Sequence, residues 1–340
     1  MPPATVAVVG ATGAVGKTML AVLEERDFPV RELIPLASAA SAGKLVDWRG
    51  GDLSVRDLAQ FDFDGVEIAL FSAGGSVSRE HAPRAAAAGA VVVDNTSAFR
   101  MEDDVPLVVP EINPDAARDR PRGIIANPNC STIQMLVALA PLHRRSRIER
   151  IVVATYQAVS GAGARGAEEL ERSSLRALEG RDPEPGEVFS HPIGFQCLPR
   201  IGAFLDDGYT SEERKMMDET RKILADDRIG VSATCVRVPV FVGHAEAVNV
   251  QTEEPISPDE ARRLIGASAG VEIADAPEAD VYPLQRSIAG RDAVAVGRIR
   301  RDPSCDRALD LWIAADNLRK GAATNAVQIA ELLLAGRTHK

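Results

Sequence analysis

Residues 5–16 read TVAVVGATGAVG, and this stretch decides the fold. Thr5–Val9 is a short apolar run of the kind that forms a strand buried in a parallel sheet. Glycines follow at positions 10, 13 and 16, where a helix over Gly16–Arg26 is predicted. Such spacing leaves backbone N–H groups at a helix N-terminus, where they can bind a pyrophosphate. A glycine turn without a ligand is the alternative, but its place directly after an N-terminal strand favours a dinucleotide.

The following residues continue a βαβ series. Strands are predicted over Glu32–Ala37, Val66–Phe71 and Ala90–Asp94, with an alanine-rich helix over His81–Ala88. A second glycine-rich turn, Phe71–Gly75, should lie at the same carboxyl edge of the sheet as the first, although a plain loop is equally compatible with it. We therefore expect an α/β fold that begins with a Rossmann-like dinucleotide-binding domain.

The residues after the second strand bear on the cofactor. Leu36–Lys44 contains no carboxylate to bond the ribose hydroxyls, as an NAD-specific enzyme would often have. Its two serines and its lack of negative charge suit a 2′-phosphate instead. The sequence thus favours NADP.

The second half of the chain has a different pattern. Strands with many β-branched residues are predicted over Arg150–Tyr156 and Thr234–Val242, and shorter ones over Ala293–Ile299 and Asp310–Ala315. They predict a mixed or antiparallel sheet, which carries helices over 167–178 and 212–224. A last helix over 325–334 could pack on either half. We expect this half to be an α+β domain.

Composition sets the remaining limits. The chain has 340 residues, of which 45% are hydrophobic and 26% charged. This length exceeds the size at which one hydrophobic core commonly splits in two, so two domains are expected. A formal charge of −10 argues against nucleic acid as a partner, and no apolar run approaches the length of a membrane span. The N-terminus lacks the basic region of a secretory signal. We expect a cytoplasmic protein that binds small molecules, with no membrane partner.

Cys130 is the most reactive group that the sequence predicts. It stands in Asn127–Thr132 (NPNCST), where a loop turns into the apolar helix predicted over Ile133–Leu142. Unpaired N–H groups and the helix dipole favour a thiolate there, although free cysteines are more often buried hydrophobes. The other cysteines, at 197, 235 and 305, form no metal-ligand or redox spacing, so neither a metal site nor a disulfide is predicted.

Seven motifs in order resemble the bacterial aspartate-β-semialdehyde dehydrogenase family. They are GATGAVG from Gly10, VVVDNTSAFR ending at Arg100, NPNCST around Cys130, TYQAVSGAG from Thr155, EERK from Glu212, RVPVFVGH from Arg237 to His244, and DNLRKGAATNAVQIAE from Asp316. Together they extend over nearly the whole chain and are highly specific. The resemblance implies an NADPH-dependent enzyme that reduces aspartyl phosphate to aspartate semialdehyde through a cysteine thioester, in lysine, threonine, methionine and diaminopimelate biosynthesis.

The resemblance also implies roles for individual residues. Catalytic roles fall to Cys130 as nucleophile, to His244 as acid and base, and to Gln157 as the group that orients the thioester. Substrate would be bound by Arg237, Glu212 and Asn129, and phosphate by Arg100 and Lys215. The cofactor would be bound by Gly10, Thr12, Gly13, Ala14, Val15, Ser38, Ala40, Ser41, Ser72, Gly74, Ser160, Gly161 and Asn317.

Arg237 and His244 set a geometric condition. A straight strand would carry them roughly 23 Å apart at about 3.3 Å per residue, so the chain must bend between them. Pro239 and Gly243 are the expected positions of the bend. Glu212 and Lys215, three apart on a helix, could equally form a solvated ion pair.

The resemblance further implies domain limits and an assembly. The dinucleotide-binding domain would comprise residues 1–127 and 318–340, and the catalytic and dimerisation domain residues 128–317. The chain would form a homodimer, with a tetramer left open. The family commonly has arginine where this chain has Ala40, which weakens the case for NADP. Arg200 also departs from the pattern and is expected outside the catalytic set.

Three rival functions are open to the sequence. N-acetyl-γ-glutamyl-phosphate reductase shares the cysteine, the histidine and the two-domain plan, but NPNCST and RVPVFVGH favour the aspartyl enzyme. A non-catalytic dinucleotide sensor or an inactive structural paralogue would be expected to lose Cys130 or His244, and both are present.

Overall fold

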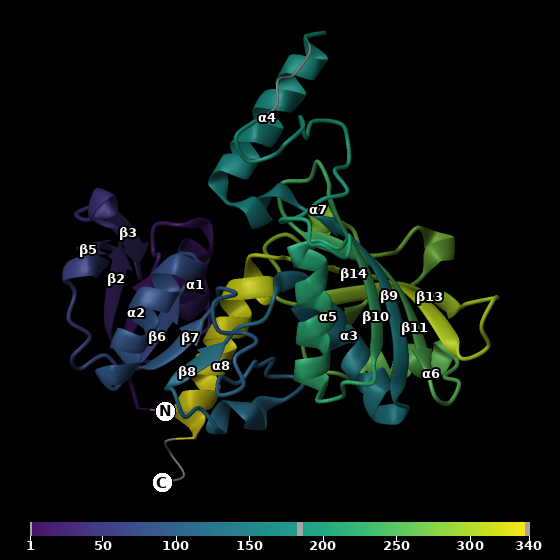
Figure 1. Ribbon diagram of the computed structural model, residues 1–340, viewed down its shortest axis with the longest axis horizontal. Coiled ribbons are helices and arrows are strands. Elements are labelled where there is room, and N and C mark those ends of the chain that lie inside the picture. The colour runs from purple at the N-terminus through teal and green to yellow at the C-terminus, as the bar shows by residue number, and fades with distance from the viewer. Residues whose placement is uncertain (1, 182–185, 337–340) are drawn as a thin grey trace. The chain divides into compact units, whose positions relative to one another are not determined.

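The computed structural model describes residues 2–181 and 186–336 (Figure 1). It divides into two compact units, Met1–Asn129 with Ala322–Lys340 and Cys130–Gly321. Residues 337–340, which the first predicted domain includes, lie outside the described residues. The assignment of separate cofactor-binding and catalytic roles to the units stays a prediction.

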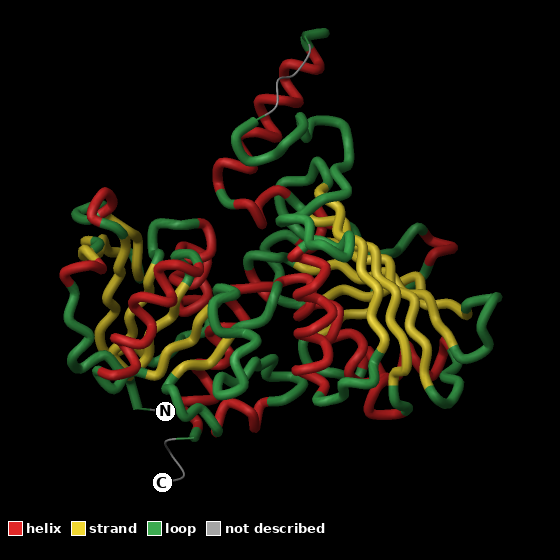
Figure 2. Tube along the Cα trace, viewed as in Figure 1, coloured by secondary structure: helices red, strands yellow, loops and turns green. Residues whose placement is uncertain are grey.

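The first unit is built on a parallel six-stranded sheet, shown in yellow in Figure 2. In spatial order its strands are β5 (Arg56–Asp57), β2 (Val30–Ala37), β1 (Ala4–Val9), β6 (Ile68–Phe71), β7 (Val91–Asp94) and β8 (Ile124–Ala126). Its helices are α1 (Ala14–Glu25), α2 (Gly75–Ala87) and α8 (Thr324–Ala335). A small hairpin, β3 (Leu45–Trp48) and β4 (Gly51–Ser54), follows β2. The Rossmann-like prediction is confirmed.

One core joins this sheet to its helices. Buried Val6 and Leu70 of the sheet belong to one cluster with Met19 of α1 and Val327 of α8. The last helix therefore packs in the first unit. The sequence alone left open whether it packs on the first or the second half of the chain.

Gly10 brings the two glycine-rich turns together. It has φ +89°, and a Cβ there would lie 2.6 Å from the Ser72 backbone oxygen, so a larger residue would strain the backbone and collide with it. Because β1 and β6 are neighbouring parallel strands, the turns that follow them meet at one edge of the sheet. The predicted common edge is confirmed.

The second unit contains a mixed six-stranded sheet. In spatial order its strands are β10 (Gly230–Arg237), β9 (Ile148–Gln157), β11 (His244–Thr252), β14 (Ala308–Ala315), β13 (Val294–Arg301) and β12 (Val271–Ile273). The outer pairs β10–β9 and β12–β13 are parallel and the inner pairs antiparallel. The mixed-sheet prediction is confirmed.

Helices cover one face of this sheet. Helix α3 (Cys130–Arg145) packs on the central strands and contacts α5 (Ser211–Leu224) and α6 (Pro258–Gly266). Helix α4 (Ala164–Leu178) follows the turn after β9, whereas α7 (Gln285–Ile288) packs on β14 from the other face of the sheet, where Ile288 clusters with Ala245 and Ala314. Figure 1 labels all five helices. Residues that face α3, such as Glu246 and Ile313, are fully buried. Their chain neighbours Ala247 and Trp312 point to the opposite face of the sheet and are only half-buried.

The strand predicted over Thr234–Val242 is wrong at its end. β10 stops at Arg237, and the chain turns before β11 begins at His244. Gly243 has φ +94°, a conformation that favours glycine, and Pro239 has no N–H to extend a ladder. The predicted bend between Arg237 and His244 is confirmed.

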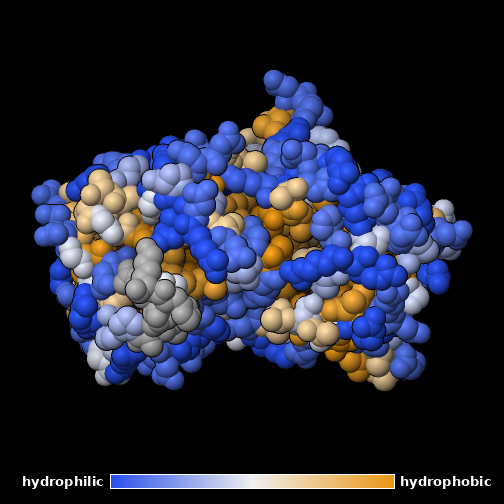
Figure 3. All heavy atoms as spheres, turned by 90° about the horizontal axis from the view of Figure 1, so that it is seen from below, coloured by the Kyte–Doolittle hydropathy of each residue, from blue (hydrophilic) through white to orange (hydrophobic). Residues whose placement is uncertain are grey.

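Among the described residues, no helix is both long and apolar enough to cross a membrane. Hydrophilic side chains cover most of the face shown in Figure 3, with hydrophobic side chains visible between them.

Candidate active site

The first unit contains a cavity of about 470 Å³ at the carboxyl edge of its sheet. Five predicted cofactor residues line it: Gly10, Thr12, Gly13, Ser38 and Ser72. Ala14, Val15, Ala40, Ser41 and Gly74 do not line the cavity but lie in the turns and helix starts that flank it. Its size and position suit a nucleotide.

Two titratable lining residues, Asp57 and His81, were missed by sequence reasoning. Asp57 caps a short helical turn by accepting from the Ala59 N–H at 3.1 Å, and its strand position pairs with Ala37. His81 is buried on α2, and burial lowers its pKa. Only the parallel pairing of β2 and β5, a long-range contact, brings Asp57 beside Ser38.

A cation lies beside the predicted 2′-phosphate loop. Lys44 Nζ donates to Ser41 Oγ at 3.4 Å. Ala40 itself is exposed in the single turn Ala39–Ser41.

Cys130 is the first residue of α3, three residues earlier than the predicted helix start. It is half-buried, and Asn129, just before it in the chain, is buried. A Cβ on Gly321 would lie 2.9 Å from the Cys130 Cβ, so glycine is needed for this close approach. No local sequence pattern indicates this role of Gly321. At the first turn of a 16-residue helix, the dipole and the N–H groups favour a Cys130 thiolate.

His244 begins β11 and is fully buried. Its Nδ1 accepts a hydrogen bond from the Ala158 N–H at 3.0 Å, while Nε2 is buried with no hydrogen-bond partner among the described residues. Burial lowers the pKa of His244 to about 3, and the charge of Arg237 acts in the same direction. Glu212 and the Gly243 backbone oppose this shift. The imidazole is therefore neutral near pH 7.

Arg237, the last residue of β10, is buried close to the reactive thiol. Its Nη1 donates to the Ala158 carbonyl oxygen at 2.8 Å. Burial lowers the pKa of Arg237, whereas electrostatic interactions with Glu212, Cys130 and Cys235 raise it. The interaction with Cys130 is mutual, so the guanidinium also favours the thiolate.

Arg200 lies in the same cavity as Arg237. Both line a space of about 480 Å³ together with Phe189 and Ser190. That Arg200 lies outside the catalytic set stays a prediction, because a shared cavity wall assigns it no role. The two positions are far apart in sequence, and a bridge between Leu198 and Arg237 brings them together.

Gln157, Glu212 and Lys215 form a chain of hydrogen bonds. Gln157 Nε2 donates to Glu212 Oε1 at 3.1 Å, and Lys215 Nζ donates to Glu212 Oε2 at 3.0 Å. Thr155 Oγ1 donates to Gln157 Oε1 at 3.1 Å. The structure thus brings a predicted catalytic residue, a substrate residue and a phosphate residue together.

Asn317 connects two loops of the second unit by hydrogen bonds. Its Oδ1 accepts from the Gly243 N–H at 2.9 Å, and its amide is hydrogen-bonded to Ser160 Oγ. Gly161, next to Ser160, faces the catalytic groups: a Cβ there would lie 3.0 Å from Arg237 Nη1 and 3.5 Å from His244 Nε2. Asn317 and Ser160, predicted to bind cofactor, thus also fix the loops that carry His244 and Gly161.

Arg100 belongs to the first unit and is largely buried. Its Nε donates to the Asn127 carbonyl oxygen and its Nη2 to the Asn95 carbonyl oxygen, both at 2.9 Å. These bonds fix the guanidinium on the segment that leads to Cys130.

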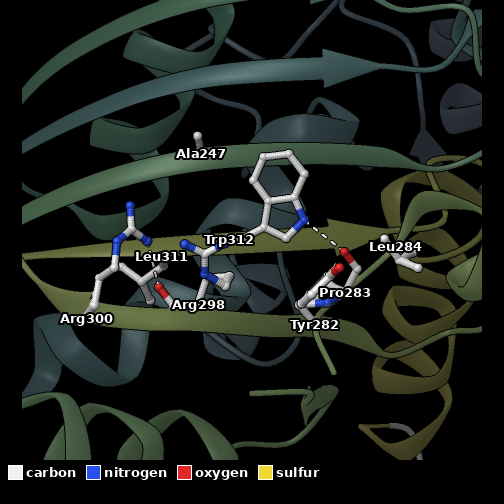
Figure 4. Close-up of a pocket in the computed structure, with 8 residues that line it drawn as sticks. All are labelled: Ala247, Tyr282, Pro283, Leu284, Arg298, Arg300, Leu311 and Trp312. Carbon is white, nitrogen blue, oxygen red and sulfur yellow. Dashed lines mark hydrogen bonds between the residues drawn. The ribbon is translucent and has the colours of Figure 1, made fainter. Parts of the chain in front are cut away.

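Another cavity of the second unit contains no predicted site residue (Figure 4). It lies on the half-buried face of the sheet and is lined by Trp312, Arg298, Arg300 and the Tyr282–Leu284 segment, among others. The Trp312 indole N–H donates to the Pro283 carbonyl oxygen at 2.9 Å. The described part of the chain holds no group of three or more His, Cys, Asp or Glu side chains placed to bind a metal.

Two family models match the chain. "Semialdehyde dehydrogenase, NAD binding domain" matches residues 5–120, and "Semialdehyde dehydrogenase, dimerisation domain" matches residues 139–320. The Aquifex aeolicus protein named aspartate-semialdehyde dehydrogenase is 54% identical over 331 residues, which cover 97% of each chain.

Solved structures of proteins with related names are similar to this chain over nearly its whole length. Aspartate semialdehyde dehydrogenase II from Vibrio cholerae, complexed with ASA, has a TM-score of 0.96 at 52% identity and covers 98% of this chain and 99% of its own. Aspartate semialdehyde dehydrogenase from Candida albicans, solved with NADP, has a TM-score of 0.75 at 25% identity and covers 98% of this chain and 99% of its own.

Proposed function

The chain belongs to the aspartate-semialdehyde dehydrogenase family, oxidoreductases that act on an aldehyde group, and we propose that it reduces aspartyl phosphate through a thioester on Cys130. The observation that carries this proposal is the position of Cys130. The thiol stands at the first residue of α3 and within the electrostatic influence of buried Arg237. Both features favour the nucleophilic thiolate.

The substrate-binding groups are proposed from the same site. Arg237 would bind the α-carboxylate with its planar guanidinium, and Glu212 the ammonium group. Gln157 would orient the thioester, and Asn129, next to the nucleophile in the chain, would contact the substrate. Because Gln157 already bonds to Glu212, one network would fix both ends of the substrate.

Phosphate would be bound by Arg100 and Lys215. A dianion favours two positive neighbours, and each side chain is restrained by hydrogen bonds within its own unit. Lys215 shares Glu212 with Gln157, so phosphate would compete with Glu212 for the ammonium group of Lys215.

The cofactor is proposed to be NADP. The cavity that Gly10, Thr12, Gly13, Ser38 and Ser72 line would hold the nucleotide, and the Candida albicans relative was solved with NADP. When bound, the nicotinamide supplies the hydride that reduces the acyl group. Ser38 and Ser41, with Lys44 hydrogen-bonded to Ser41, would interact with the 2′-phosphate in place of an arginine at position 40.

The assembly is proposed to be a homodimer formed through the second unit. The family model that matches this unit describes a dimerisation domain, and one face of its sheet carries half-buried Tyr156 and Trp312, whose rings lie 5.3 Å apart. The enzyme would work in the cytoplasm, in the synthesis of lysine, threonine, methionine and diaminopimelate.

One assay tests the reaction. Purified protein with aspartate semialdehyde should reduce NADP only when inorganic phosphate is present, and NAD should be reduced more slowly. The Cys130→Ala variant should bind NADPH as the wild type does but show no turnover. Residual turnover near the wild-type rate in that variant would refute the thioester route.

A further inference from the structure

We infer that Asn325, the second residue of α8, is a positioning residue for phosphate binding. Through the side chain of Asn127 it fixes the two backbone carbonyl groups that hold the Arg100 guanidinium. This inference rests on the proposed function, in which Arg100 binds phosphate. Neither Asn325 nor Asn127 has a role in that function as stated above, and all the contacts that carry the inference lie within the first unit.

The topology of the first unit brings three asparagines together. β7 and β8 are neighbouring parallel strands, and Asn95 and Asn127 directly follow their ends at the carboxyl edge of the sheet. Asn325 joins them from α8, 198 positions after Asn127 in the chain. Asn127 and Asn325 are fully buried, and a buried amide needs hydrogen-bond partners within the protein.

One row of hydrogen bonds joins the three side chains. Asn325 Nδ2 donates to the Val108 carbonyl oxygen at 3.0 Å and to Asn127 Oδ1 at 2.7 Å. Asn127 Nδ2 in turn donates to Asn95 Oδ1 at 2.6 Å and, over a longer distance of 3.4 Å, to the Ala322 carbonyl oxygen. The row therefore runs from a backbone carbonyl, through the amides of Asn325 and Asn127, to the side chain of Asn95.

The backbone sets the direction of this row. The Val108 carbonyl oxygen can only accept, so the nitrogen of the Asn325 amide, and not its oxygen, must face it. The second proton on that nitrogen points at Asn127, whose amide must present its oxygen there and its nitrogen toward Asn95. Aspartate at position 325 would have nearly the same shape but no donor. It would place a carboxylate oxygen against two acceptors and break the row at its first bonds.

The backbone of the same two asparagines holds Arg100. Arg100 Nε donates to the Asn127 carbonyl oxygen and Nη2 to the Asn95 carbonyl oxygen, both at 2.9 Å. These two bonds fix the plane of the guanidinium, and the orientation of that planar fork decides how well it binds a phosphate. Because the side chains of Asn95 and Asn127 are bonded to each other, the positions of the two carbonyls depend on the row that Asn325 directs.

Steady-state kinetics with inorganic phosphate and aspartate semialdehyde test the inference. In Asn325→Asp we expect KM for phosphate to rise about tenfold, the loss that follows when one buried hydrogen bond no longer holds a binding group. KM for aspartate semialdehyde should stay near the wild-type value. Asn325→Ala removes the amide without adding a charge, and should show the same pattern if the aspartate variant does not fold. An unchanged KM for phosphate, or equal rises for both substrates, would overturn the inference.

Gln328→Glu is the matched control for the loss of an amide donor on α8. Gln328 lies one turn after Asn325, and its Nε2 donates to Glu111 Oε1 at 3.1 Å, outside the row of asparagines. This variant should leave KM for phosphate as it is in the wild type. A rise as large as that in Asn325→Asp would show that any disturbance of α8 weakens phosphate binding, and would overturn the inference.

A double-mutant cycle shows whether Asn325 acts through Arg100. Arg100→Gln removes the proposed phosphate contact, so Asn325→Asp added to it should cause no further loss of kcat/KM for phosphate. Additive losses would mean that Asn325 affects phosphate binding by another route, and would overturn the inference.

Hydrogen exchange followed by mass spectrometry tests the positioning without turnover. Peptides that cover residues 95–100 and 127–130 should exchange faster in Asn325→Asp than in the wild type, and at the wild-type rate in Gln328→Glu. Unchanged exchange of both segments in Asn325→Asp would overturn the inference. A wild-type protein without phosphate-dependent turnover would instead overturn the proposed function, and the exchange result stands independently of it.

Discussion

The two units bind their proposed ligands with different kinds of groups. In the second unit the functional groups are side chains, buried and hydrogen-bonded to one another, such as Arg237, Gln157 and His244. In the first unit the nucleotide cavity is built mainly from backbone at Gly10, Gly13 and Ser72, and Ser38 is exposed. The comparison predicts that single side chains control catalysis, whereas backbone conformation controls cofactor binding.

Arg237→Lys should have the largest effect among the changes that test this comparison. Lysine loses the bidentate fork for a carboxylate and the bond to the Ala158 carbonyl, so kcat/KM should fall by about 10²- to 10³-fold. Steady-state kinetics measure this loss. Arg200→Lys, in the same cavity but exposed, is the matched control and should change kcat/KM by no more than a few-fold. Similar losses in both variants would contradict the assignment of Arg237.

Gly10→Ala should destabilise the first unit by about 1–3 kcal/mol and weaken NADPH binding. The reason is both its positive φ and the 2.6 Å contact that a Cβ would make with Ser72. Gly74→Ala is the control, because Gly74 has φ +95° but no atom within 4 Å of an added Cβ. Urea unfolding and NADPH fluorescence compare the two. Equal effects would mean that φ alone, and not the close approach of the two turns, requires glycine at position 10.

Glu246→Gln should make the stability of the second unit less sensitive to pH. Burial raises the Glu246 pKa well above its ordinary value, so above about pH 4.5 the unfolded chain loses a proton that the folded protein keeps. Wild-type stability should therefore fall by about 1.4 kcal/mol per pH unit from this group as pH rises, until the folded pKa is reached. The difference in unfolding free energy between variant and wild type, measured from about pH 5 to pH 7, should grow in favour of the variant. A constant difference would show that Glu246 is ionised in the folded protein.

Ala40→Arg should have the smallest effect, about a tenfold gain in NADP affinity with NAD affinity unchanged. The added guanidinium would join Ser38, Ser41 and Lys44 beside the 2′-phosphate. Fluorescence titration with NADPH and NADH measures the ratio of affinities. Lys44→Gln is the counterpart and should weaken NADPH binding alone; loss of affinity for both cofactors would indicate a structural role for Lys44.

Local patterns predicted much of the fold. Apolar runs located the parallel strands of the first unit, and glycine spacing located the turn after β1. The pattern failed at Val238–Val242, where β-branched residues favour a strand but Pro239 and Gly243 end it. There the turn chemistry, and not the apolar run, determines the backbone.

The candidate site was predictable where one motif carries the chemistry, as at Cys130. Residues that act through a long-range contact were not. Gly321 is needed only because it lies against Cys130, and Asp57 lines the nucleotide cavity only because β5 pairs with β2. The hydrogen bond from the Ala158 N–H to His244 Nδ1 joins residues 86 positions apart in the chain, which no local pattern encodes.

The covalent intermediate on Cys130 tests the central claim most directly. Enzyme mixed with aspartate semialdehyde and NADP, without phosphate, should accumulate the thioester, because no phosphate is present to release it. Acid quenching and peptide mass spectrometry should then find one aspartyl group on the peptide that contains Cys130, and none in Cys130→Ala. The absence of this adduct in the wild type, or an adduct on Cys197 or Cys305 instead, would contradict the account.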